Sequence, residues 1–348
     1  MLFQQVRAGG CLSYVIGCEH TRAGMLVDPH LDQLDRYRAI ATELGIRIHY
    51  VAETHTHADH FSAARELAGS LGAHVVMHRN AAAPFADVRV DDGESIVLGW
   101  LRIRALHTPG HTNDSMCLVL ADRVLTGDTL LIEGTGRTDL PTGDPDALYD
   151  SLFGKLLLLD GGLGVWPAHD YKGSGHGPEI GRSSSTIAAE LANNPRLQKT
   201  DRAEFVALMR GLDLAMPKHL SEALRTNRTG AKTVAQLISE ASRGISFMAM
   251  DELARRLGEP DLIVLDVREA QEFAKGHLPG AKHIPRGQLE LRVDKELPDP
   301  TIRILTYCQL GKISTLAAAT LRSMGFARAV ALDGGYDAWT RAALPTEL

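Results

Sequence analysis

Short apolar runs separated by turns dominate the chain up to about residue 170. The strand-like runs are CLSYVIG (11–17), AGMLVD (23–28), IHYVAETH (48–55), AHVVMH (73–78), ESIVLG (94–99), LRIRALHTPGH (101–111), SMCLVLA (115–121) and RVLTGD (123–128). Two helical segments interrupt them, at 31–45 and 61–72, and each closes on a glycine that suits a helix C-terminus. This mixture predicts an α/β fold with two sheets flanked by helices.

The pattern changes twice in the second half of the chain. Residues 180–243 are helical in character, and the polar stretch RTNRTGAKT (225–233) is the most linker-like part of the sequence. After residue 245, strand-like runs alternate with amphipathic helices, which predicts a compact domain with a mostly parallel sheet. We therefore expect a domain at 1–230, a linker at 231–244 and a second domain at 245–348.

Composition and charge exclude several classes of partner. The 348 residues include 44% apolar and 23% charged side chains, as in an ordinary globular protein. The net charge of −6 argues against a nucleic-acid partner, which requires a basic face. No apolar run approaches the ~20 residues of a membrane-spanning helix, and the N-terminus lacks the layout of a signal peptide. We expect no membrane partner and a cytoplasmic location, in which the four cysteines are free thiols.

The densest chemistry in the sequence is the stretch THTHADHF. His55, His57, Asp59 and His60 follow the run IHYVAE and so lie at a strand end, where α/β proteins place functional groups. Three histidines and an acid this close together would be costly to bury unpaired, so the cluster indicates a metal site. An isolated histidine elsewhere in the chain is more often a surface or satisfied core residue.

Three more candidate ligands occupy the same kind of position. His111 lies in TPGHT, Asp128 in LTGDT and His169 in WPAHD, each just after a strand-like run. Imidazole and carboxylate groups are the donors that a borderline divalent metal prefers. Because the same donors serve zinc and iron, these residues leave the identity of the metal open.

The motifs THTHADH, GHT, TGD and PAHD, in this order, resemble the metallo-β-lactamase superfamily, whose fold is an αββα sandwich. Within it, GDTLLIEGTGRTDLPTGDPDALYDSL, PAHDYKG and NPRL are most similar to the persulfide dioxygenases. The resemblance implies one Fe(II) per chain, held by His55, His111 and Asp128, with the remaining positions open for O2 and substrate. It also implies a set of residues that support the ligands by hydrogen bonds: His57, Asp59, His60 and His169.

The same resemblance implies a substrate, glutathione persulfide, which O2 oxidises to sulfite with release of glutathione. Arg137 in GTGRTD matches an arginine that those enzymes place near the glutathione carboxylates, where a planar guanidinium suits the task. Tyr171 and Lys172 in AHDYKG are further candidate glutathione contacts. The alternative for Arg137 is a structural salt bridge, for instance to Asp139.

A second reactive position lies in TYCQLGKIST (306–315). Cys308 follows a strand-like run and precedes a helix whose first residues are near Ser314. Loop amides, the positive end of the helix dipole and Lys312 would together stabilise a thiolate there. The alternative, a buried structural cysteine, is the commoner fate of this residue type.

The spacing C-x-x-G-x-x-S, with LIVLDVREAQEFAKGHLPGAKHIP and LDGGYDAW, resembles the rhodanese sulfurtransferases. The resemblance implies that Cys308 carries a persulfide within an active loop formed by Gln309, Leu310, Gly311, Lys312, Ile313 and Ser314. Such loops often have arginine where this chain has Gln309 and Ile313, which weakens electrostatic capture of thiosulfate. The residues expected to support the loop are Asp266, Arg268 and His277.

The two resemblances together predict a bifunctional enzyme of sulfide metabolism. It would oxidise glutathione persulfide at iron and transfer sulfane sulfur between thiosulfate and glutathione through Cys308, with sulfite as the other product or substrate. One alternative is a dinuclear zinc thioester hydrolase of glyoxalase II type with an appended rhodanese domain. The other is a rhodanese module that relays persulfide sulfur to a protein partner. The sequence leaves a homo-oligomer open.

Overall fold

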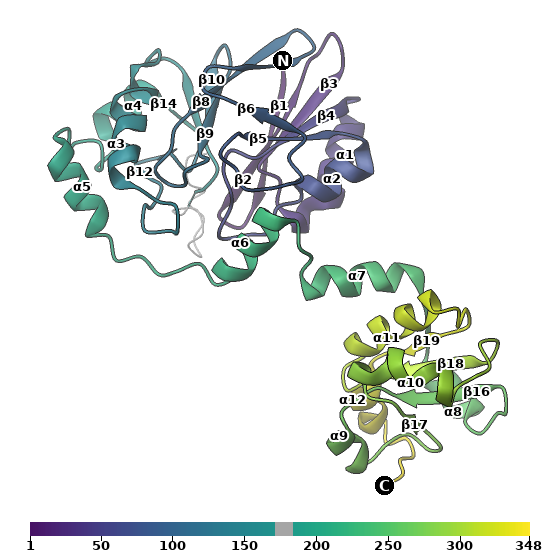
Figure 1. The fold of residues 1–348 in the computed structure, drawn as a ribbon. Coiled ribbons are helices and arrows are strands. Elements are labelled where there is room, and N and C mark those ends of the chain that lie inside the picture. Colours follow the sequence, from purple (N-terminus) through teal and green to yellow (C-terminus); the bar gives the residue numbers. More distant parts are fainter. Residues whose placement is uncertain (171–183) are drawn as a thin grey trace. The chain divides into compact units, whose positions relative to one another are not determined.

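Two six-stranded sheets form the centre of Met1–Ala231, the first of two units into which the computed structural model divides (Figure 1). The structure describes residues 1–170 and 184–348. The first sheet has the order β1 (Leu2–Ala8), β2 (Cys11–Gly17), β3 (Ala23–Val27), β4 (Arg47–Ala52), β5 (His74–His78), β6 (Val88–Val90). The second has the order β14 (Ser185–Thr186), β13 (Gly164–Pro167), β10 (Arg123–Gly127), β9 (Met116–Val119), β8 (Leu101–His107), β7 (Ser95–Leu98). A separate two-stranded ladder joins β11 (Leu130–Leu131) to β12 (Gly134–Thr135).

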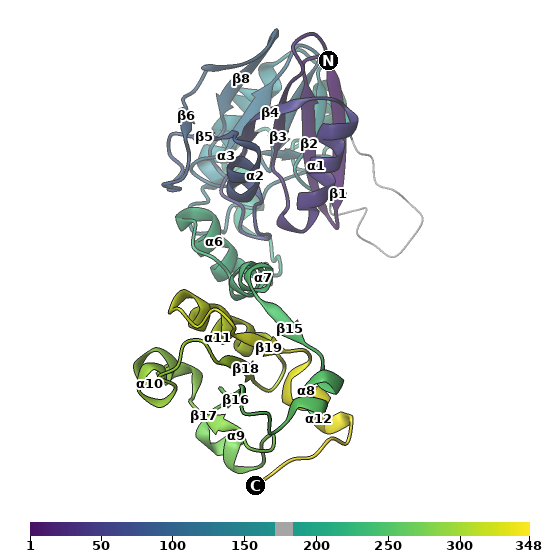
Figure 2. The same cartoon turned by 90° about the vertical axis from the view of Figure 1, so that its right-hand side faces the viewer.

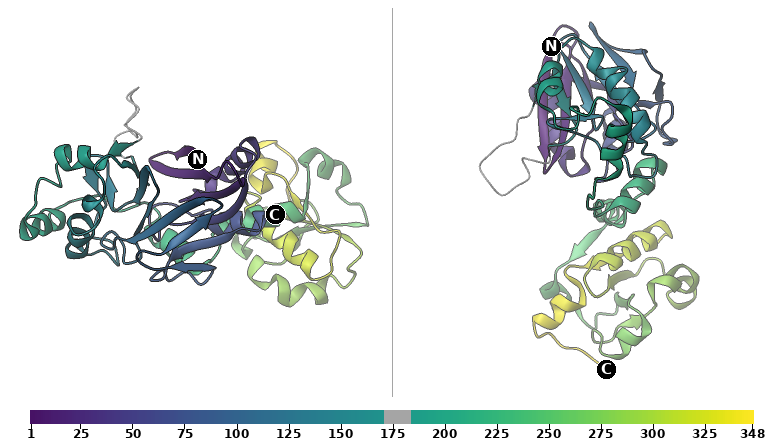
Figure 3. Two further views of the ribbon diagram at one scale, coloured as in Figure 1. Left: turned by 90° about the horizontal axis from the view of Figure 1, so that it is seen from above. Right: turned by 90° about the vertical axis from the view of Figure 1, so that its left-hand side faces the viewer.

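Helices cover the outer face of each sheet, which gives the four layers of an αββα sandwich. Helices α1 (Leu34–Glu43) and α2 (Ala64–Leu71) lie in front of the first sheet in Figure 2. The second sheet is covered on its own outer side, the side that faces the viewer in the right-hand view of Figure 3, by α3 (Pro145–Phe153), α4 (Ile187–Asn193) and α5 (Arg202–Arg210). Both helical segments expected at 31–45 and 61–72 are present, and α2 ends at Gly72 in the left-handed conformation.

Alternation along the strands separates the cores of these layers. In β2, Tyr14 and Ile16 pack into the core between the two sheets, whereas Val15 between them packs under α1 and α2. Burial on both faces explains why these strands appear as continuous apolar runs in the sequence. The predicted fold class of this domain is therefore confirmed.

The polar stretch at 225–233 is more ordered than its composition indicates. Helix α6 (Leu220–Thr229) runs through most of it, and Asn227 on this helix is buried. Its side-chain Nδ2 donates to the backbone carbonyls of His57, at 2.9 Å, and His60, at 2.8 Å. Polar residues here serve a tertiary contact, so composition alone is a poor guide to a linker.

The second unit, Lys232–Leu348, is built on a five-stranded sheet in which every recorded strand pair is parallel. Its order is β15 (Ser246–Met248), β19 (Val330–Leu332), β18 (Arg303–Tyr307), β16 (Leu262–Asp266), β17 (Lys282–His283). Its helices are α7 (Val234–Gly244), α8 (Met250–Arg256), α9 (Ala270–Ala274), α10 (Leu289–Glu296), α11 (Lys312–Ser323) and α12 (Gly335–Arg341). The mostly parallel sheet predicted for this domain is confirmed.

The predicted linker at 231–244 coincides largely with α7, which packs against α11 of the same unit. Its Thr233 forms a capping box with Gln236, so the helix start is specified locally. The exact domain boundary stays a prediction. Across the described residues, no helix is both long enough and apolar enough to cross a bilayer.

Candidate metal centre and sulfur-transfer loop

The candidate metal ligands lie at strand ends of both sheets of the first unit. His55 follows β4 of the first sheet, whereas His111 and Asp128 follow β8 and β10 of the second. The two sheets approach closely here: a Cβ at Gly127, where φ is +51°, would lie 2.6 Å from Thr54 Oγ1. Glycine at this position therefore lets the end of β10 reach the loop that carries His55.

A chain of hydrogen bonds fixes the ring of His55. Thr54 Oγ1 donates to Asp28 Oδ2 at 2.8 Å, so the same oxygen accepts from His55 Nδ1 at 2.9 Å. This places the proton on Nδ1 and leaves the lone pair on Nε2. His55 Nε2 is buried and has no hydrogen-bond partner among the described residues. A buried nitrogen with a free lone pair is what a metal ligand requires.

His111 and Asp128 complete a set of three donors around the same point. His111 Nδ1 donates to the carbonyl of Arg137 at 2.8 Å, which leaves Nε2 available 3.6 Å from Asp128 Oδ2. One donor atom each from His55, His111 and Asp128 lies within 4.8 Å of the others, and all three residues are buried. Two imidazoles and one carboxylate on one side of a point are a donor set that suits iron(II) as well as zinc.

His169 holds the carboxylate of Asp128 in place. Its Nδ1 lies 2.6 Å from Asp128 Oδ1, and its Nε2 lies 2.7 Å from Asp59 Oδ2. Burial by itself would lower the pKa of His169, but the charges of Asp128 and Asp59 raise it well above the usual value. Burial likewise opposes ionisation of Asp128, yet His169 keeps the pKa of this carboxyl below its usual range. Asp128 is thus an oriented carboxylate with Oδ2 left for a metal.

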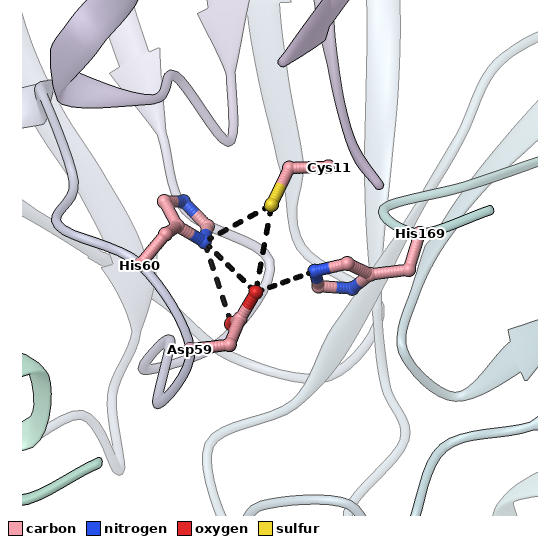
Figure 4. A group of neighbouring side chains, drawn as sticks. All are labelled: Cys11, Asp59, His60 and His169. Atoms are coloured by element: carbon pink, nitrogen blue, oxygen red, sulfur yellow. Dashed lines mark hydrogen bonds and ion pairs between the residues drawn. The ribbon is translucent and has the colours of Figure 1, made fainter. Parts of the chain in front are cut away.

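Asp59 lies at the centre of a neighbouring group with His169, His60 and Cys11 (Figure 4). Cys11 Sγ donates to Asp59 Oδ2 at 3.5 Å and lies 3.8 Å from His60 Nδ1. The antiparallel bridge between Cys11 and His169 brings the β1–β2 hairpin to this place. Sequence reasoning missed Cys11 because a cysteine at a strand end carries no local signal of such a partner.

His57 is held by two acids that sequence reasoning also missed. Its Nε2 lies 2.7 Å from Glu53 Oε2 and 3.2 Å from Asp28 Oδ1, and all three residues are buried. Asp28 also accepts from the backbone N–H of Thr54 at 2.7 Å. A usable signal was present, because both acids close strongly apolar runs, where an acid is unusual.

A cavity of about 550 Å³ opens onto Asp128, His111 and His169. Arg137 belongs to its lining, and its guanidinium binds Asp139 through two contacts of 2.6 Å. The same guanidinium donates to the carbonyls of residues 214 and 215, which form another part of the wall. The salt bridge considered as an alternative for Arg137 is therefore present. Tyr171 and Lys172 lie outside the described residues.

Arg196, in the NPRL stretch, is a second arginine in the lining of this cavity. Its Nη1 donates to Thr135 O at 2.6 Å and to Thr135 Oγ1 at 3.0 Å. Among the described residues it has no carboxylate partner, and burial lowers its pKa. A guanidinium paired only with neutral oxygens keeps its charge uncompensated, so it can attract an anionic group that enters the cavity.

In the second unit, Cys308 follows β18 directly and is 4% exposed. Its Sγ accepts from the backbone N–H of Ser314 at 3.3 Å, in the first turn of α11. Gly311, with φ at +80°, turns the chain from the strand into this helix. Leu310 and Ile313 are 59% and 50% exposed, so two residues of the loop present apolar side chains to solvent. The loop therefore presents a shielded sulfur to the N-terminus of a helix.

Asp266 and Arg268 brace this loop from the end of β16. Arg268 binds Asp266 Oδ2 through Nε at 3.0 Å and Nη2 at 2.7 Å, and donates to Gly276 O at 2.7 Å. His277 lies beside Gly276 and pairs with Glu347 through two backbone hydrogen bonds, of 2.8 and 2.9 Å. These contacts are of the kind expected for supporting residues.

Comparison with known proteins gives two family matches that follow the two units. Residues 6–169 match the metallo-beta-lactamase superfamily, and residues 249–342 match the rhodanese-like domain. A hydroxyacylglutathione hydrolase of Anaeromyxobacter dehalogenans is 35% identical over 198 residues, which cover 50% of this chain and 76% of that protein. Superfamily membership alone therefore spans more than one chemistry.

The persulfide dioxygenases give the more extensive match. The human mitochondrial persulfide dioxygenase ETHE1 is 37% identical over 225 residues, covering 64% of this chain and 85% of that protein. The crystal structure of ETHE1 from Myxococcus xanthus aligns with a TM-score of 0.62 and 40% identity, covering 66% of this chain and 98% of that one. The chain therefore belongs to the ETHE1 persulfide dioxygenase family through its metallo-β-lactamase domain, which is joined to a rhodanese domain.

Proposed function

We propose that the first domain, residues 1–230, is an iron(II)-dependent persulfide dioxygenase that acts on glutathione persulfide. The balanced reaction is GSSH + O2 + H2O → GSH + SO3²⁻ + 2 H⁺. The observation that carries the proposal is the convergence of His55 Nε2, His111 Nε2 and Asp128 Oδ2, each left available by hydrogen bonds on its other polar atom. Iron(II) bound there would supply the redox chemistry that zinc lacks.

The residues of this chain have distinct parts in that reaction. His55, His111 and Asp128 would hold the metal, and His169 would keep Asp128 oriented. Arg196 and Arg137 line the cavity, where their positive charges favour the carboxylates of the glutathione moiety. Asp59, His60 and His57 would act as supporting residues; Tyr171 and Lys172 are further candidate contacts with glutathione.

Metal analysis combined with an oxygen electrode tests this proposal. We expect about one iron per chain and iron-dependent O2 uptake with glutathione persulfide in the wild type. His55→Ala should lose both, whereas His49→Ala, a matched control on the exposed side of β4, should retain both. Iron-loaded protein that consumes no O2 with this substrate would contradict the proposal.

The second domain, residues 245–348, is proposed to transfer sulfane sulfur through Cys308. The thiolate of Cys308 attacks the outer sulfur of thiosulfate, which forms a Cys308 persulfide and releases sulfite. A glutathione thiolate then attacks the outer sulfur of that persulfide, which forms glutathione persulfide and restores the thiolate. The hydrogen bond from Ser314 N–H to Cys308 Sγ, which holds the sulfur at the N-terminus of α11, supports this assignment. Loss of sulfite release from thiosulfate and glutathione in Cys308→Ser tests the assignment.

A two-metal hydrolase is the second candidate for the first domain. It is favoured by the buried atoms His57 Nδ1 and His60 Nε2, which have no hydrogen-bond partner among the described residues. The group of Cys11, Asp59, His60 and His169 also offers donor atoms within 4.8 Å of one another. Two zinc ions per chain and hydrolysis of a 2-hydroxyacylglutathione thioester, without O2 uptake, would favour this candidate.

A further inference from the structure

Position 309, directly after the reactive cysteine, departs from the arginine that related loops often carry. The side-chain amide of Gln309 lies between two charged groups: Oε1 accepts from Arg268 Nη1 at 3.2 Å, and Nε2 donates to Asp337 Oδ1. Chemistry dictates this orientation of the amide, because a guanidinium only donates and a carboxylate only accepts. A glutamine satisfies both partners at once.

Both partners of Gln309 are themselves fixed. Arg268 is 7% exposed, paired with Asp266, and lies 3.9 Å above the ring of Tyr336. Asp337 lies in the first turn of α12, whose N-terminal amides also bind the loop backbone. The N–H of Tyr336 donates to Cys308 O at 2.9 Å, and the N–H of Asp337 donates to Gln309 O at 3.0 Å. Cys308 is therefore bound to α12 through its main chain, and Gln309 through both its main chain and its side chain.

The contact between α12 and the loop is close enough that no side chain fits between them. Gly335 has φ at +66°, and a Cβ there would lie 2.6 Å from both Cys308 O and Gly311 N. Gln309 thus links three separate elements: the end of β16 through Arg268, the loop itself, and α12 through Asp337. A guanidinium at position 309 could donate to Asp337, but it would offer Arg268 no acceptor and would place a like charge beside it in a partly buried position.

We propose that Gln309 is a positioning residue of the sulfur-transfer site: its amide joins Arg268 to Asp337 and so holds Cys308 Sγ against the N–H of Ser314. The side chain of Gln309 fixes the position of the nucleophile, Cys308 Sγ, and does not bind the anionic sulfur donor. This deepens the proposed sulfur transfer at Cys308 and rests on it. It also gives a physical reason for the absence of arginine at this position.

Reversing the polarity of the contact with Asp337 tests the proposal. Gln309→Glu keeps the acceptor for Arg268 but sets a carboxylate against Asp337, and we expect kcat for thiosulfate-to-glutathione transfer to fall about tenfold with KM little changed. Adding Asp337→Asn restores a donor opposite Glu at 309, so the double variant should recover most of that loss. Asp333→Asn, an exposed carboxylate of the preceding turn, is the matched control and should behave as wild type.

A direct arginine substitution separates positioning from substrate binding. Gln309→Arg should lower kcat without lowering KM for thiosulfate, since the new charge faces Arg268. A lower KM in this variant, or a double variant no better than Gln309→Glu, would overturn the proposal. A second readout is independent of turnover: the rate at which iodoacetamide alkylates Cys308, followed by mass spectrometry of its peptide, should fall in Gln309→Glu and recover in the double variant. If the wild type transfers no sulfur, the proposed function fails, while the alkylation rates still decide whether Gln309 positions Cys308.

Discussion

The metal centre and the sulfur-transfer loop place reactive groups at strand ends by opposite means. The centre gathers residues from loops after β4, β8, β10 and β13, which belong to two different sheets. The loop is one continuous stretch, residues 308–314, that runs from the end of β18 into the first turn of α11. Metal ligation needs several side chains at one point, whereas a single sulfur nucleophile needs one side chain and several backbone amides.

The supporting residues differ in the same sense. Around the metal centre they are mostly buried acids, which orient imidazole rings through ring N–H groups. Around the loop the supporting groups are a buried Asp266–Arg268 pair and the N-terminus of α12, which fix the position of the loop backbone and of Cys308. Substitutions of supporting residues in the first region should therefore lower the metal content. Substitutions in the second should lower the rate of sulfur transfer and leave the metal content unchanged.

The largest expected effects come from removing one reactive group in each region. His55→Ala should lower iron binding and O2 uptake at least about a hundredfold and leave sulfur transfer unchanged. Cys308→Ser should lower sulfur transfer at least about a hundredfold and leave iron binding and O2 uptake unchanged. Metal analysis, oxygen uptake and sulfite release measure the three quantities on the same preparations. Loss of both activities in either variant would mean that the two regions depend on one another.

Replacing His169 by alanine should give the next largest effect. Asp128 Oδ1 would lose its 2.6 Å partner, so the carboxylate would turn more freely and metal affinity should fall about 10–100-fold. Iron retained after dialysis against a weak chelator measures this affinity. His57→Ala is the informative comparison, since its ring is bound to Glu53 and Asp28, and iron should be only partly lost. Equal loss of two metals in both variants would favour the dinuclear alternative.

Substitution of the two cavity arginines should change substrate affinity by smaller and unequal amounts. Arg196→Ala removes a guanidinium that has no carboxylate partner in the part of the chain that the structure describes, so KM for glutathione persulfide should rise about tenfold with kcat maintained. Arg137→Ala should also destabilise the wall at residues 214–215, so its effect should include kcat. Steady-state oxygen uptake over a range of persulfide concentrations separates the two cases. An unchanged KM in Arg196→Ala would exclude this arginine from binding.

The smallest effect concerns the link from α6 to the metal cluster. Asn227→Ala leaves the buried carbonyls of His57 and His60 without their donor, which should cost about 1–3 kcal/mol of unfolding free energy. Urea denaturation followed by circular dichroism measures it. Thr229→Ala, on the same helix, is the control, because among the described residues its hydroxyl makes only local hydrogen bonds: it donates to Arg225 O and accepts from the N–H of Ala231. Identical stabilities would show that α6 is not required for the cluster.

Much of this organisation follows from local sequence. Apolar runs bounded by turns predicted the strands, because a strand buried on both faces consists of consecutive apolar residues. The fold classes predicted for both domains are confirmed. The ligand candidates were recognisable for a related reason. His55, His111 and Asp128 each lie within a few residues after the end of a strand, so the sequence pattern alone predicts that they lie at the edge of a sheet.

What the sequence by itself determined is therefore the set of reactive residues and the elements that carry them. Only the tertiary structure decided their partners: Cys11 beside Asp59, Asp28 and Glu53 on His57, Gln309 between Arg268 and Asp337. These contacts join residues whose separation in the chain is set by strand order and helix packing. A buried polar group needs a hydrogen-bond partner, and the packing of the whole fold determines which residue lies close enough to be that partner.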